Sequence, residues 1–162
     1  MNSLARRDFY KPIPSPREQT AHMKLVCPGF DYRFEKGTLI GVGDIIPSAS
    51  SRRYRFQIRY GVTKSPSVTI LDPPLKTRED QTKIPHTYGP NEPCLFRPWV
   101  DWSSDKLLAY TVFPWLGMWL VYYELWLATG TWFGGGEHPV IEDAASPPEE
   151  NIGDEYVQDS QP

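Results

Sequence analysis

The sequence is poor in cysteine, with only Cys27 and Cys94 among its 162 residues. Two thiols cannot form the disulfide framework that holds many small secreted domains together. The N-terminus carries charges but no apolar run behind them, so it lacks the pattern of a secretory signal. We therefore expect a cytoplasmic, reducing setting, in which a lone cysteine in a special context is a candidate nucleophile.

Lysine and arginine are absent from Glu137 to the end of the chain, where acidic residues, proline and serine are frequent. Basic residues gather earlier, and Arg53, Arg55 and Arg59 alternate with aromatic and aliphatic residues. That alternation is typical of the solvent face of a half-buried strand. Because neutralising phosphates requires clustered cations, the charge distribution argues against a nucleic-acid partner.

A long apolar run suited to crossing a membrane is also missing. The uncharged stretch Leu107–Tyr123 contains Pro114 and ends before Glu124. A membrane-spanning helix needs roughly 20 predominantly apolar residues, with aromatic residues gathered at its two ends. The stretch favours a buried core helix that is broken or kinked at Pro114. A membrane-anchored protein remains a minor alternative.

The pattern divides the chain into three parts. Residues 1–14 read as an N-terminal arm, residues 15–138 as one folded domain, and residues 139–162 as an acidic disordered tail. The domain begins with a helix signal, because Ser15 can cap, Pro16 suits the first helical position and Glu18 completes a capping box. This helix should end near Cys27-Pro28-Gly29.

Four strand signals follow, over residues 30–35, 38–46, 53–60 and 67–71, and the short turns between them predict an antiparallel meander. Residues 75–106 contain four prolines, Pro85, Pro90, Pro93 and Pro98, without convincing periodicity, and such a long irregular segment is usually functional. Helices are predicted from about residue 104 to Pro114 and from there to about Ala128, with Gly130 as a stop. The order predicts an α+β architecture with helices on one face of the sheet.

Cys94 lies in the irregular segment, in the run His86-Thr-Tyr-Gly-Pro-Asn-Glu-Pro-Cys94. A thiolate can accept and return an acyl group without an elaborate triad, and His86 could supply a nearby cation or orient a hydrogen bond. The alternative is a buried structural thiol, since free cysteine is among the most buried residue types. A zinc site is disfavoured, because the cysteines and histidines lack paired ligand spacing. We expect no metal and no cofactor.

Several pieces in a fixed order resemble the ubiquitin-conjugating-enzyme-like proteins of bacterial CBASS operons (cyclic-oligonucleotide-based anti-phage signalling). They are Pro66–Leu75, Pro85-His86-Thr87-Tyr88, Cys94-Leu95, Trp102, Pro114-Trp115, Trp119-Leu120, Tyr123–Trp126, Thr129–Trp132 and His138.

The resemblance implies the ubiquitin-conjugating-enzyme-like fold: an N-terminal helix, a four-stranded antiparallel meander, an active-site loop and C-terminal helices. It also implies that Cys94 becomes thioester-linked, with His86 opening the active-site segment and Tyr88, Trp102 and His138 in support. In eukaryotic relatives this histidine is followed by Pro and by an Asn that helps to stabilise the oxyanion. Thr87 and Tyr88 occupy these two positions here. Backbone N–H groups or Tyr88 would then have to stabilise the oxyanion.

The partner implied by the resemblance is a cyclic-oligonucleotide-forming nucleotidyltransferase. Its C-terminus would be joined to Cys94 as a thioester and then transferred to a target. This predicts a cysteine acyltransferase in bacterial anti-phage defence. The alternative from a different class is a non-catalytic binding module that docks and regulates the nucleotidyltransferase, with Cys94 only packing.

Overall fold

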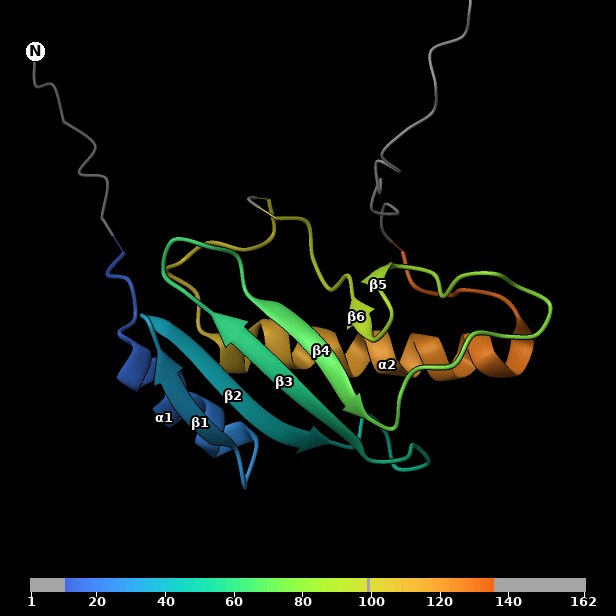
Figure 1. Cartoon of the computed structure of the whole chain (residues 1–162), viewed down its shortest axis with the longest axis horizontal. Helices are drawn as coiled ribbons and strands as arrows, with labels where there is room; N and C mark the ends of the chain where they lie inside the picture. Colours follow the sequence, from blue (N-terminus) through green and yellow to red (C-terminus); the bar gives the residue numbers. More distant parts are fainter. Residues whose placement is uncertain (1–10, 99, 136–162) are drawn as a thin grey trace, which may run out of the picture.

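A helix and a four-stranded sheet form the first half of the computed structural model, which describes residues 11–98 and 100–135. The elements are α1 (Pro16–Val26), β1 (Asp31–Glu35), β2 (Thr38–Ile45), β3 (Tyr54–Tyr60) and β4 (Ser67–Asp72). The strands pair antiparallel in the order β1-β2-β3-β4, which confirms the predicted meander (Figure 1). Residues 1–10 of the predicted arm, His138 and the predicted tail at 139–162 lie outside the described residues.

The predicted capping box starts helix α1. The Ser15 hydroxyl accepts the Glu18 backbone N–H at 3.2 Å, and the Glu18 carboxylate accepts the Ser15 backbone N–H at 2.7 Å. Two backbone donors that the first helical turn would leave unpaired are thereby satisfied. Local sequence is therefore sufficient to set this boundary.

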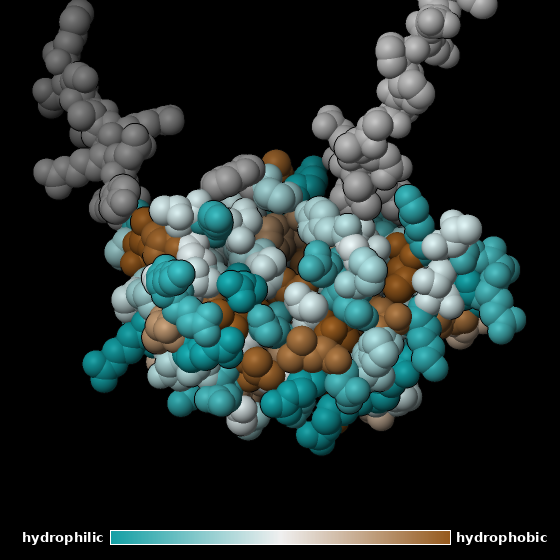
Figure 2. All heavy atoms as spheres, viewed as in Figure 1, coloured by the Kyte–Doolittle hydropathy of each residue, from teal (hydrophilic) through white to brown (hydrophobic). Residues whose placement is uncertain are grey.

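Both long helices lie behind the sheet in the view of Figure 1. Strand β3 explains this arrangement, because its residues alternate strictly between buried and more exposed positions, with Tyr54, Phe56 and Ile58 buried and Arg55 and Arg59 exposed. The apolar side packs against the helices and the arginine side forms part of the open face. In this view hydrophilic side chains cover most of the surface, with smaller apolar patches among them (Figure 2).

The second half of the domain is built on one long helix, α2 (Val112–Thr129), preceded by the short 3-10 helix η1 (Leu108–Tyr110). The prediction of two helices separated at Pro114 is wrong. Pro114 lies in the first turn of α2, where a missing N–H removes no intrahelical hydrogen bond. Gly130 ends the helix with a φ of 79°, as predicted for a stop signal. No helix among the described residues has the length and apolar character needed to cross a bilayer.

A small hairpin interrupts the segment that was predicted to be irregular. Strands β5 (Thr87–Gly89) and β6 (Glu92–Pro93) pair antiparallel, and Asn91 between them adopts a φ of 63°. Asn91 also ties the hairpin to the rest of the fold: its backbone C=O accepts the Ile70 N–H, and its side-chain oxygen accepts the Leu75 N–H at 2.6 Å. The hairpin is thus held against β4 immediately before Cys94.

Candidate active site

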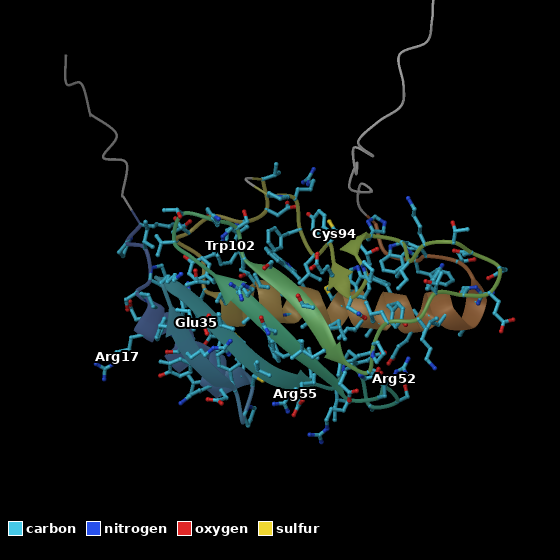
Figure 3. The ribbon with its side chains drawn as sticks, in the orientation of Figure 1. Arg17, Glu35, Arg52, Arg55, Cys94 and Trp102 are labelled. Carbon is cyan, nitrogen blue, oxygen red and sulfur yellow. The ribbon has the colours of Figure 1, made fainter. Side chains whose placement is uncertain are left out.

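Cys94 follows strand β6 directly and stands near the β5–β6 hairpin on the upper side of the molecule in Figure 3. Its backbone N–H donates to the His86 carbonyl at 2.8 Å, which closes the hairpin at its base. The side chain is half-buried and lines a cavity of about 540 Å³. A thiol placed in this way is fixed by its backbone and reachable from outside, which a nucleophile requires.

His86 shares this cavity with Cys94, but its backbone organises the site as much as its ring does. The residue is 6% exposed and has a φ of 52°, which turns its carbonyl toward the core. That carbonyl accepts the Trp119 indole N–H at 3.0 Å as well as the Cys94 N–H. The imidazole stacks on Trp132, with ring centroids 5.1 Å apart. Helix α2 therefore holds the start of the candidate active-site segment through Trp119.

Tyr88 brings a hydroxyl to the candidate nucleophile. Burial raises the pKa of this hydroxyl, and its hydrogen bond with Cys94 raises the pKa further. The tyrosine is therefore protonated at neutral pH, so it can donate to the sulfur. Its side chain remains 45% exposed, which leaves the hydroxyl accessible to an incoming group.

Trp102 and His138, the other two predicted supporting residues, do not stand beside Cys94 among the described residues. Trp102 is 4% exposed and packs between Tyr60 and Phe96, with ring centroids 5.9 and 6.2 Å away. It therefore lies in the core behind Phe96, which itself lines the Cys94 cavity. His138 is outside the described residues.

The sequence analysis missed an ion pair in the wall of the Cys94 cavity. The Arg97 guanidinium and backbone N–H both donate to Asp101, at 2.8 to 3.2 Å. These hydrogen bonds hold the pKa of the Asp101 carboxyl below its usual value. Opposite charges four residues apart, just after the cysteine, were the available sequence signal.

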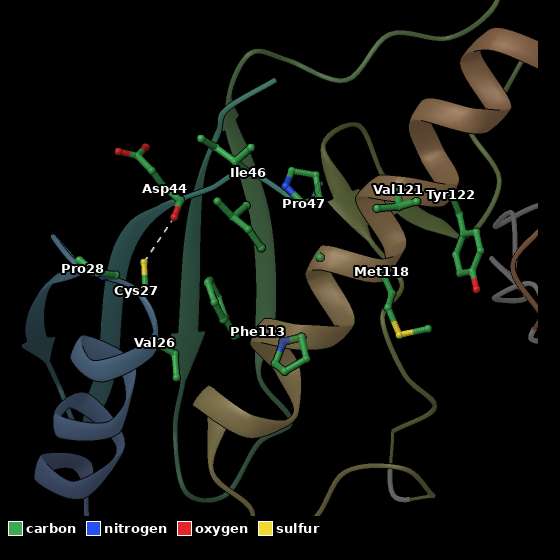
Figure 4. A pocket seen from close by; sticks show the side chains of 13 residues that line it. Val26, Cys27, Pro28, Asp44, Ile46, Pro47, Phe113, Met118, Val121 and Tyr122 are labelled. Carbon is green, nitrogen blue, oxygen red and sulfur yellow. Dashed lines mark hydrogen bonds between the residues drawn. The ribbon is translucent and has the colours of Figure 1, made fainter. Parts of the chain in front are cut away.

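The other cysteine has a different environment. Cys27 is 1% exposed, burial raises the pKa of its thiol, and its sulfur donates to the Asp44 carbonyl at 3.4 Å (Figure 4). It contributes to a larger, mostly apolar cavity of about 600 Å³ between the end of α1 and helix α2, where Met118 projects from α2. A buried, mostly protonated thiol is a weak nucleophile, which leaves Cys94 as the better candidate.

Within residues 11–98 and 100–135, no three His, Cys, Asp or Glu side chains gather in a way that could hold a metal ion.

Comparison with known protein families gives one match. The family model described as "Type II CBASS E2 protein" matches residues 19–139, which is most of the chain and includes the whole Cys94 site. A search of curated proteins found no match.

Proposed function

The chain belongs to the type II CBASS E2 proteins, and from that membership we propose that Cys94 carries an acyl group as a thioester. An E2-like role in anti-phage defence follows from the family itself. The acyl donor that we propose is the C-terminus of a partner cyclic-oligonucleotide-forming nucleotidyltransferase, which the protein then passes to a target. The observation that carries the proposal is the half-buried Cys94 thiol, which lines a cavity and whose backbone is fixed at the base of the hairpin.

In the loading step, the Cys94 thiolate attacks the carbonyl carbon of an activated C-terminus. A tetrahedral intermediate forms, the bond to the leaving group breaks, and the thioester remains on the sulfur. The donor must arrive activated, because a thiolate does not displace oxygen from a free carboxylate. In the transfer step, an amine or thiol of the target attacks the same carbonyl and releases Cys94.

Tyr88 is the group that supports this chemistry best. Before loading, its hydroxyl lies at the sulfur, where it can donate a hydrogen bond. As the tetrahedral intermediate forms, the charge moves from sulfur to the adjacent oxygen, which comes within the reach of the same hydroxyl. The tyrosine thus stabilises the oxyanion, a role that an asparagine side chain has in eukaryotic relatives.

His86 and Asn91 support the reaction through position. The His86 carbonyl fixes the Cys94 backbone, and the side-chain oxygen of Asn91 already accepts the Leu75 N–H. Asn91 therefore stabilises the hairpin that carries the segment before Cys94.

A binding module without catalysis is the second candidate function. The specific observation that favours it is the 600 Å³ cavity along α2, which is larger than the Cys94 cavity and mostly apolar. Met118 in its wall is 55% exposed, as expected for a docking anchor.

Variants of Cys94 separate the two functions. The wild-type chain, Cys94→Ser and Cys94→Ala would each be co-expressed with the nucleotidyltransferase and analysed by intact-mass spectrometry. We expect a thiol-sensitive adduct with the wild type, a thiol-resistant ester or none with Ser, and none with Ala. Cys27 is retained in every variant, so an adduct at that residue would persist in Cys94→Ala. If the wild type binds the partner but forms no adduct even when the partner's C-terminus is supplied as a thioester of a small thiol, the enzyme function is wrong and the binding module is favoured.

A further inference from the structure

Another, more enclosed cavity adjoins the Cys94 cavity. Its volume is about 270 Å³, and its walls come from the start of β4, the β5–β6 hairpin and the residues after Cys94. Leu95 and Phe96 line both this cavity and the Cys94 cavity. Tyr88, whose hydroxyl hydrogen-bonds Cys94, is part of the wall as well. The enclosed cavity therefore borders the site where an acyl chain would be attached.

The lining of the enclosed cavity selects the chemistry of an occupant. Most of its wall is apolar, from Pro66, Val68, Pro93, Leu95, Phe96 and Pro98. Ser67, Tyr88 and the exposed Glu92 add polar groups to the wall. Burial of an aliphatic or aromatic side chain against the apolar groups is favourable, whereas a carboxylate would lose its hydration there and be repelled by Glu92. An apolar cavity of about 150 Å³ already admits a benzene ring. The space here is sufficient for one large apolar side chain.

The same wall contains a group that a peptide could satisfy. The Ser65 hydroxyl is buried and has no hydrogen-bond partner within the described part of the chain. Buried hydroxyls are normally paired, and one that is left alone destabilises the free protein. A peptide that inserts a side chain here also brings backbone N–H and C=O groups to the wall. Peptides thus match both the apolar and the polar features of the cavity.

From this arrangement we infer that the enclosed cavity is a specificity pocket, which binds an apolar side chain close to the C-terminal end of the acyl donor. The inference rests on the proposed thioester function and adds the substrate preference of that site. A thioester on Cys94 fixes the donor's terminal carbonyl at the sulfur. Each extended residue advances the chain by about 3.3 Å, so only the last few donor residues can reach a cavity that borders Tyr88 and Leu95.

The open Cys94 cavity, in contrast, suits the entry of the acceptor. It is lined by the polar groups of Arg97 and Asp101 along with Cys94 itself. An acceptor amine must remain hydrated until it reaches the thioester, and the open, polar Cys94 cavity allows water to accompany it. The two cavities therefore divide the site into a donor side and an acceptor side.

Short peptide thioesters test the pocket without a separate activating enzyme. The probes are hexaglycine thioesters of a small thiol, in which leucine replaces one of the last three glycines in turn. The Cys94 thiolate attacks the thioester carbonyl, the bond to the small thiol breaks, and the released thiolate takes a proton from water. Loading of the full-length protein is followed by intact-mass spectrometry under single-turnover conditions.

We expect leucine at one of the three positions to load at least about tenfold faster than glycine, the range that apolar pockets provide. Val68→Phe, which fills the cavity, should reduce that ratio to near one. Val68→Ala, which enlarges the cavity, should shift the preference from leucine toward phenylalanine at the same position. Thr69→Phe is the matched control, because the next residue of β4 points to the opposite face of the sheet, and it should keep the wild-type ratio.

The preference is a ratio measured within each variant, so partial unfolding of a variant cancels from it. If all probes load the wild type at similar rates, the specificity pocket is wrong while the thioester function stands. If none loads Cys94 although iodoacetamide alkylates it, the proposed function itself fails. A leucine preference that Val68→Phe and Val68→Ala both leave unchanged would also overturn the inference. The inference is also wrong if the Val68 variants change only the transfer of the acyl group to a free amine and not the loading of Cys94.

Discussion

The hydrogen bond from Trp119 to the His86 carbonyl connects helix α2 to the active-site segment, and Trp119→Phe removes it. The Nε1–O distance is 3.0 Å, and the two residues are only 4% and 6% exposed. Phenylalanine retains an apolar ring at this position but has no N–H group. The variant should therefore weaken the attachment of the loop without introducing a charge or a clash.

The size of the effect follows from the contacts that remain. The His86 carbonyl keeps the Cys94 N–H at 2.8 Å, so it is not left unpaired, and the net loss is one hydrogen bond of about 1 kcal/mol. The smaller ring also leaves space beside Tyr123, on which Trp119 stacks with centroids 5.5 Å apart. Such a cavity adds about 1–2 kcal/mol. For a chain of this length, a total of about 2–3 kcal/mol lowers the thermal midpoint by about 5–10 °C.

Trp126→Phe provides a matched control on the same helix. Trp126 is 1% exposed, and its indole N–H donates to the Gln81 side chain at 2.9 Å. The same atoms are removed, with a similar expected loss of stability, but the broken bond does not involve His86. The two variants should therefore have similar thermal midpoints but differ in the accessibility of the Cys94 thiol.

The assay pairs thermal unfolding with the rate at which iodoacetamide alkylates Cys94, located by peptide mass spectrometry. We expect Trp119→Phe to alkylate a few-fold faster than the wild type, because a half-buried thiol becomes more accessible when its backbone anchor loosens. Trp126→Phe should alkylate at the wild-type rate. Equal alkylation rates in both variants would refute a specific link between α2 and the Cys94 loop. An unchanged midpoint for Trp119→Phe would refute the hydrogen bond itself.

Three other predictions concern separate contacts. Tyr88→Phe should slow loading of Cys94 from a peptide thioester by about tenfold or more, since a hydrogen bond to a charged group is worth about 1.5–3 kcal/mol; an unchanged single-turnover rate would contradict the role of the hydroxyl. Gly41→Ala should cost about 1–3 kcal/mol in urea unfolding, because a Cβ there collides with the Phe30 ring, whereas Gly61→Ala has room and should cost far less. Ser15→Ala should lower the thermal midpoint more at neutral than at acidic pH. Hydrogen bonds from Ser15 hold the pKa of Glu18 below its usual value. This stabilisation is therefore present above about pH 4.3 and is lost as the pH falls through the lower folded pKa. An equal loss of thermal midpoint at neutral and at acidic pH would contradict the prediction.

Local signals predicted the elements that depend on neighbouring residues. The capping box at Ser15, the alternation along β3 and the stop at Gly130 are each confirmed at their predicted places. These features arise from hydrogen bonds within one turn or from the two faces of one strand. A short sequence window contains all the information that they need.

The failures occurred where local patterns were ambiguous. Pro114 breaks a helix in its interior but is tolerated in its first turn, and the sequence did not reveal that α2 begins only at Val112. The β5–β6 hairpin has too few residues to show a period, and it depends on the bonds of Asn91 to Ile70 and Leu75. The first error concerns where a helix begins and the second whether a hairpin forms, and long-range packing decides both.

The sequence alone identified a thiol in a proline-rich segment between a meander and an apolar helix, because composition and spacing are properties of the chain itself. Only the tertiary structure decided what surrounds Cys94. The Tyr88 hydroxyl reaches the sulfur because a hairpin turns it there, and the His86 carbonyl is anchored by Trp119, 33 positions further along the chain. Contacts between residues so distant in sequence form only when the helix packs on the sheet, so no local pattern could reveal them.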